Sequence, residues 1–162
     1  MTDNTIQLNN NDERLIIKIQ DEEGNDTGNT LIFDLGDIEL PLRYQELVEQ
    51  DKKNRLYLKN QLAIIEKKED HKGKKILSAN EEAGIKAMME FFKKEKDIYD
   101  MFLGKGGVNK LLNGRTFTWT SLAEVDEIIS KQIMPLIEQN AKDYTQIIKD
   151  KYSIKKGSGV IE

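Results

Sequence analysis

The only histidine of the chain, His71, is the first residue to consider for catalysis, because an imidazole is the usual base at neutral pH. A Ser-His-Asp arrangement needs that base beside a hydroxyl and a carboxylate. His71 lies in the charged, glycine-containing stretch 69–77, EDHKGKKIL, which indicates a solvated loop. The chain also has no cysteine, which excludes thiol catalysis, thiolate metal sites and disulfides. We therefore expect no catalytic residues and no enzymatic activity.

The acidic stretch 21–26, DEEGND, carries oxygen ligands of the kind that calcium prefers. The EF-hand spacing requires glycine at its sixth place and glutamate at its twelfth. Counted from Asp21, those places hold Asp26 and Ile32, so the stretch fits an acidic hairpin turn instead. We expect no bound metal.

The stretch 104–107, GKGG, has the composition of a phosphate-binding loop but lacks the G-x-x-x-x-G-K-[ST] spacing. The residues before it indicate a helix, whereas phosphate loops of this kind follow a strand. We interpret the glycines as a helix stop followed by a turn, and we expect no cofactor.

Charge is distributed unevenly, although the formal net charge is only −4. The first part of the chain is acidic, and basic residues crowd residues 52–75. A solvated helix face explains these lysines more simply than a nucleic-acid site does. The same holds for Phe117 and Trp119 near Lys105 and Lys110, because aromatic residues at a helix start are more often core. Nucleic acid is not the partner we expect, although a regulator that binds it through 52–75 is a third alternative.

At 162 residues the chain is long enough for one domain with a substantial core. No run of residues approaches the length of about eighteen apolar residues that a membrane span needs. Residues 1–12 lack the basic and apolar regions of a signal peptide, and we expect them to be a flexible N-terminus. We therefore expect a soluble protein of the cytosol with no membrane partner.

The front of the chain predicts a β-hairpin over residues 14–35. Arg14–Gln20, RLIIKIQ, alternates Leu15, Ile17 and Ile19 with residues of the other face, which is typical of a strand. Residues 30–35 form the second strand, with its odd-numbered residues on the buried face. Two strands alone are marginal in water, so the hairpin must pack on helices or pair with another chain.

A long helix is predicted from Pro41 to about residue 68, because proline is tolerated in the first turn. The charged residues 51–55 interrupt its apolar stripe, and we allow for a break or bend there.

The central helix is predicted over residues 79–103. Ser78 and Glu81 have the spacing of a capping box at its start, and Gly104 ends it. An apolar stripe at three- and four-residue steps includes Ile85, Met88, Met89, Phe91, Phe92, Tyr99 and Phe102. Such a stripe fills a core or offers an adaptable surface to a partner, and both interpretations stay open.

A third main helix is predicted over residues 121–152, with Ser121 and Glu124 in capping-box spacing and a kink or break near residues 133–134 caused by Pro135. The tail 153–162 contains two glycines and a serine, and we expect it to be flexible. The predicted fold is α+β, mostly α, with an N-terminal β-hairpin packed on a bundle of three main helices. One domain would span residues 13–152.

Two stretches of the chain resemble a known family. They are GDIELPLRYQEL, residues 36–47, and MEFFKKEKDIYDMFLGKGGVNKLLNG, residues 89–114. The order of a β front end, a helix opening at a proline, an FF…IYDMFLGKG helix and a capped final helix resembles the small tail assembly chaperones of long-tailed phages (siphophages) of Gram-positive bacteria. The resemblance covers roughly residues 31–137.

The resemblance implies a non-enzymatic protein of the host cell cytoplasm that is absent from the mature virion. Such a chaperone would bind and solubilise the tape measure protein and help to recruit the tail tube protein. The residues that match the family pattern are Phe91, Phe92, Tyr99, Phe102 and Gly104. Together with Met88 they are our candidates for partner-binding or core residues.

The alternative is a structural or self-associating component of the phage particle, because an acidic front and a basic middle can associate head to tail into a homo-oligomer.

Overall fold

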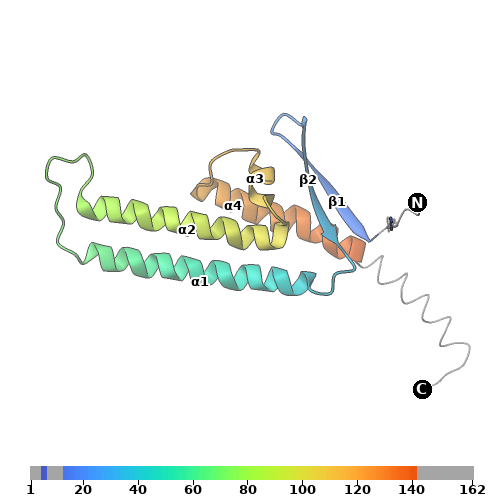
Figure 1. The fold of residues 1–162 in the computed structure, drawn as a ribbon, viewed down its shortest axis with the longest axis horizontal. Helices are drawn as coiled ribbons and strands as arrows, with labels where there is room; N and C mark the ends of the chain where they lie inside the picture. Colours follow the sequence, from blue (N-terminus) through green and yellow to red (C-terminus); the bar gives the residue numbers. More distant parts are fainter. Residues whose placement is uncertain (1–4, 7–12, 142–162) are drawn as a thin grey trace, which may run out of the picture.

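The computed structural model describes residues 5–6 and 13–141. Two strands, β1 (Arg14–Gln20) and β2 (Asp26–Asp34), precede the helices (Figure 1). The helical elements are α1 (Leu40–Glu66), α2 (Ala79–Leu103), α3 (Gly107–Leu112), α4 (Trp119–Ile128) and the π-helical turn η1 (Ile129–Ile133), after which residues 134–141 are again α-helical. The fold is mostly α with an N-terminal hairpin, as the sequence predicts.

The hairpin has the predicted inner face. Its strands are antiparallel, with Leu15 opposite Phe33 and Ile17 opposite Leu31. Leu31 and Phe33 are buried, because this face packs on the helices. On the outer face Ile16 lies opposite Ile32, and both are about half exposed. The acidic turn between the strands is closed by Asp21, whose carboxylate accepts backbone N–H bonds from Glu23 at 2.9 Å and Asn25 at 2.8 Å, as expected for a hairpin turn.

α1 is one continuous helix, so the chain does not break at residues 51–55. It lies antiparallel to α2 along most of its length (Figure 1). The polar residues that interrupt its apolar stripe are satisfied in place: Asn54 is buried against α2, and Asp51 pairs with Arg55 at 2.8 Å. A buried polar group is costly only when it has no hydrogen-bond partner, so these paired residues do not interrupt the helix.

α2 begins and ends at the predicted residues. The Ser78 hydroxyl accepts from the Glu81 N–H at 3.1 Å, and the Glu81 carboxylate accepts from the Ser78 N–H at 3.2 Å, which confirms the capping box. Gly104 ends the helix with φ +96°, a backbone angle that favours glycine. The short helix α3 then turns the chain back toward the hairpin, and Asn29 of β2 donates to the Lys110 carbonyl at 3.3 Å.

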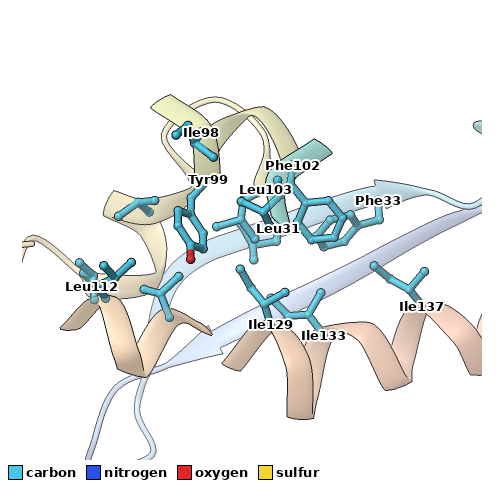
Figure 2. Close-up of a cluster of buried hydrophobic side chains, with 14 of the residues drawn as sticks. Leu31, Phe33, Ile98, Tyr99, Phe102, Leu103, Leu112, Ile129, Ile133 and Ile137 are labelled. Atoms are coloured by element: carbon cyan, nitrogen blue, oxygen red, sulfur yellow. The ribbon is translucent and has the colours of Figure 1, made fainter. Parts of the chain in front are cut away.

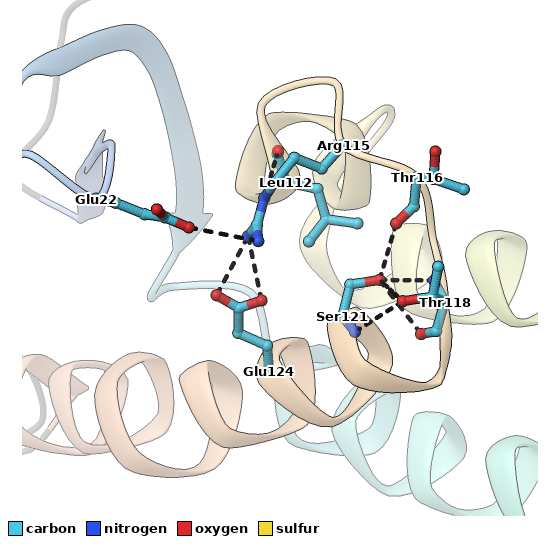
Figure 3. A network of polar contacts seen from close by, with 7 residues as sticks. All are labelled: Glu22, Leu112, Arg115, Thr116, Thr118, Ser121 and Glu124. Atoms are coloured by element: carbon cyan, nitrogen blue, oxygen red, sulfur yellow. Dashed lines mark hydrogen bonds and ion pairs between the residues drawn. The ribbon is translucent and has the colours of Figure 1, made fainter.

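The predicted start of the last main helix at Ser121 is wrong. α4 begins at Trp119, and its N-cap is Thr118, whose hydroxyl accepts from the Ser121 N–H at 3.3 Å (Figure 3). The Ser121 hydroxyl in turn accepts from the Thr118 N–H at 2.6 Å, so serine takes the place that glutamate holds in the usual capping box. Glu124 binds Arg115 instead.

The kink or break predicted near residues 133–134 is not a break, but the helix is irregular there, because the π-helical turn η1 lies just before Pro135. One π-helical turn precedes Pro135, and the Met134 N–H donates to the Ile129 carbonyl. A wider turn gives the proline ring room that an α-helix lacks, so the chain stays helical. The predicted end of this helix at residue 152 and the flexible segments 1–12 and 153–162 lie outside the described residues, apart from residues 5–6.

The core lies between the hairpin, α2, α3 and the last helical segment (Figure 2). Phe102 joins its parts, with its ring centroid 5.4 Å from Phe33 of β2 and 5.5 Å from Tyr44 of α1. In the described part of the chain, no helix is long and apolar enough to cross a membrane.

Two glycine-to-alanine substitutions test this packing, and we expect them to change the stability of the protein in opposite directions. A Cβ on Gly107 would lie 2.4 Å from the Leu103 Cβ, an atom that moves only with its backbone. Gly107→Ala should therefore lower the free energy of unfolding by about 1–3 kcal/mol. A Cβ on Gly84 would meet only the Leu62 Cδ2 at 3.8 Å, so Gly84→Ala should raise stability by up to about 1 kcal/mol through helix propensity. Urea denaturation of both variants measures this, and two shifts of the same sign would contradict it.

Candidate partner-binding surface

The structure divides the six predicted site residues between the core and its margin. Phe91, Tyr99 and Phe102 are buried within the chain. Met88 and Phe92 are half-buried against the core. Gly104 is exposed at the end of α2, where it serves as the C-cap. The predicted stripe is thus core in the second half of α2 and partly open in the first half.

The reason for this division is that α4 covers only part of α2. α4 begins beside the middle of α2, where the Trp119 ring stacks on Phe91 with centroids 5.0 Å apart and meets the edge of Phe92 at 4.9 Å (Figure 1). The α1–α2 pair continues past this point toward the loop that joins the two helices. No described helix lies over the first half of α2 on the side that α4 covers further along.

The uncovered part carries large apolar side chains. Ile85 is 40% exposed, Met89 is 65% exposed and Trp119 is 46% exposed. Helical spacing places Ile85 and Met89 on one side of α2 with the half-buried Met88 and Phe92. We call these five residues, Ile85, Met88, Met89, Phe92 and Trp119, the open α2 surface. It continues the apolar face that α4 buries, so a further helix placed there would extend the packing of α4.

A buried polar contact joins α1 to α2 one turn after Phe91, next to the open α2 surface. Glu95 is fully buried, and its Oε1 accepts from the Asn54 Nδ2 at 2.8 Å. The same amide donates to the Phe91 carbonyl at 3.1 Å. The second carboxyl oxygen, Oε2, has no hydrogen-bond partner among the described residues. Burial, and next the neighbouring Asp51 carboxyl group, raise the pKa of Glu95 to about 8, so the buried carboxyl group is mostly neutral at pH 7.

One turn further along α2, a second polar contact holds α4. The Tyr99 hydroxyl donates to Asp126, and burial followed by this carboxylate raises the pKa of Tyr99. Arg55 of α1 reaches the same carboxylate at 3.3 Å while it pairs with Asp51. Burial raises the pKa of Asp126 as well, against the opposing effect of the Tyr99 hydrogen bond. Arg55 of α1 and Tyr99 of α2 thus both contact Asp126, which connects all three helices at this carboxylate.

Sequence reasoning missed Asn54 and Glu95. Both stand among charged residues, and nothing in the local pattern separates them from solvated neighbours. The one available indication is that Glu95 lies four residues after Phe91 and four before Tyr99, on the apolar face of the predicted helix.

A comparison with protein-family models, with characterised proteins and with solved structures finds no match to this chain. Among the residues that the structure describes, no group of three or more histidine, aspartate or glutamate side chains is placed to hold a metal ion. The open α2 surface is therefore an exposed apolar surface at the margin of the helical core, the kind of feature that makes it a candidate site for a partner with an apolar surface of its own.

The buried Glu95 should make stability depend on pH. Its pKa is raised in the folded chain, so the unfolded chain loses the proton first and stability falls as pH rises from about 4.5 to about 8. Glu95→Gln keeps an acceptor for Asn54 and cannot ionise. It should gain stability relative to the natural chain across this window, by about 1.4 kcal/mol for each unit of pKa difference. Urea unfolding midpoints at several pH values measure this.

The exposed Glu90 on the same helix supplies the matched control, because Glu90→Gln removes a solvated carboxylate. Its stability should follow that of the natural chain at every pH. If Glu95→Gln and Glu90→Gln show the same pH dependence, Glu95 does not titrate as a buried group.

Proposed function

We propose that this protein is a non-enzymatic phage tail assembly chaperone that binds and solubilises the tape measure protein. The observation that carries the proposal is the open α2 surface, an apolar helix face left uncovered beside the start of α4. A client helix can lie along it, next to α4, with its own apolar side covered.

The composition of this surface suits a client with many similar apolar segments. Met88 and Met89 are unbranched and adapt their shape to different neighbours. The open α2 surface consists of five side chains, so each contact with a client would be small and reversible. Several copies could therefore bind along one long client and be displaced later.

The identity of the client and of the second partner comes from the family resemblance. In this proposal the protein acts in the cytoplasm of the infected host cell, helps to recruit the tail tube protein around the tape measure protein, and leaves before the virion is complete.

A structural component of the phage particle is the second candidate, and the distribution of charge favours it. The loop that joins α1 to α2 is rich in lysine, whereas the hairpin turn carries Asp21, Glu22 and Glu23 (Figure 1). These groups lie toward opposite ends of the molecule, so copies could associate head to tail. Virion content separates the two candidates, since a structural component stays in purified particles and a chaperone does not.

Co-expression with the tape measure protein tests the chaperone proposal. The natural chain should keep the client soluble and co-purify with it. Met89→Lys places a charge in the middle of the open α2 surface and should lower the co-purified client about tenfold, the effect of losing about 1.4 kcal/mol of binding. Its own melting temperature should stay unchanged, because Met89 is mostly exposed.

Leu56→Lys is the matched control. Leu56 is 58% exposed and lies two residues from the buried Asn54 and Leu58, so it points away from α2. This variant should bind the client as the natural chain does. A client that stays insoluble with the natural chain would overturn the chaperone proposal. If Met89→Lys and Leu56→Lys lower the amount of co-purified client equally, the open α2 surface is not where the client binds.

A further inference from the structure

A groove of about 670 Å³ opens between β1 and the last helical segment of the described chain. One wall consists of β1 residues and the following turn, residues 17–23. Residues at four-residue steps along the helical segment form the opposite wall: Glu124, Ile128, Gln132 and Leu136. The buried side chains of Leu31, Leu112 and Ile133 close the bottom.

The groove follows the edge of β1 and not one of its faces. Ile17 and Ile19 of the inner face line it together with Lys18 and Gln20 of the outer face. Successive residues of a strand point to opposite faces, so all four border one space only along the edge. Among the described residues, residues 17–20 of β1 pair with β2, and no described strand lies along the other edge of this part of β1. Such an edge can accept the backbone of an added strand.

The helical wall opposite β1 carries apolar side chains that the chain itself does not fully bury. Leu136 is 39% exposed, and Ile128 is only partly buried. An extended segment in the groove would pair with the β1 edge and cover these side chains with its own alternate residues. A helix in the same place would cover them but would leave the backbone groups of β1 unpaired. The groove therefore favours a strand as its occupant.

Carboxylates gather at the end of the groove that the hairpin turn forms. Asp21, Glu22 and Glu23 line this end, and Arg115 reaches it from the segment after α3 (Figure 3). The Arg115 guanidinium lies 3.7 Å from Glu22, and one of its nitrogens lies 3.2 Å from both carboxylate oxygens of Glu124. A guanidinium thus already fits between the turn and α4. Glu22 and Glu23 stay exposed, so a further basic side chain would find carboxylates there.

We propose that this groove binds an extended segment of a partner protein as a third strand beside β1. The segment would alternate apolar residues, which face Ile128 and Leu136, with polar ones, and it would carry a lysine or arginine at the end next to Glu22 and Glu23. This partner site lies on a different part of the molecule from the open α2 surface and does not depend on the chaperone proposal.

A synthetic peptide tests the proposal on the full chain. The probe alternates valine and threonine over about six residues, the length of a typical strand, with two lysines at one end. A matched peptide has the same sequence with alternate backbone nitrogens methylated, which removes the donors on one edge. The unmethylated peptide should bind at least about tenfold more tightly, and it should slow hydrogen exchange at amides of residues 16–20.

Three exposed positions locate the binding. Leu136→Lys places a charge on the helical wall and Glu22→Lys reverses charge at the acidic end, and each should weaken peptide binding about tenfold without changing the fold. Glu46→Lys, on the exposed side of α1, is the control for the change in net charge and should bind as the natural chain does.

Equal binding of the two peptides, absence of binding, or binding that ignores Leu136→Lys and Glu22→Lys would each overturn the proposal. Sedimentation of the protein without peptide tests whether a second copy of the chain occupies the groove. If the chain forms dimers that Leu136→Lys dissociates while the peptide does not bind, the groove belongs to a second copy of the chain and the proposal is wrong.

Discussion

The hydrogen bond between Asn54 and Glu95 is the contact on which the arrangement of the helices depends. A fully buried carboxyl group is costly without a partner, so α1 must stand where Asn54 can reach it. Apolar side chains alone would tolerate a slide of one helix along the other, whereas a buried polar pair specifies one register. That register also brings Arg55 to Asp126, which accepts a hydrogen bond from the Tyr99 hydroxyl, and so places α4 on the pair.

With α4 placed there, the point at which α4 begins decides which apolar residues stay open. α4 begins at Trp119, beside Phe91 in the middle of α2, and the helical segment continues from there away from the first half of α2. The second half of α2 is therefore core, and the first half keeps Ile85 and Met89 exposed. One helical stripe thus contains both core residues and the residues of the proposed binding surface, according to the half of α2 in which they lie.

The hairpin completes the core at the other end of the molecule. Its two strands could not persist alone in water, and they are held because Leu31 and Phe33 pack on the helices. The same packing keeps one edge of β1 beside a groove in place of open solvent. The two proposed binding surfaces differ in chemistry for this reason: one offers apolar side chains to a helix, and the other also offers backbone groups to a strand.

The sequence by itself determined the local elements, because strand alternation, the Ser78–Glu81 capping box and the glycine stop at Gly104 depend on neighbours along the chain. It misplaced the start of α4, because Ser121 has capping spacing in both directions and only the geometry selects Thr118 as its partner. It also could not separate the core residues of the α2 stripe from the open ones. Tertiary structure alone decided that division, together with the burial of Glu95 and the continuity of α1, because each depends on which distant segment lies opposite. Periodicity specifies the face of a helix, and only packing specifies what covers it.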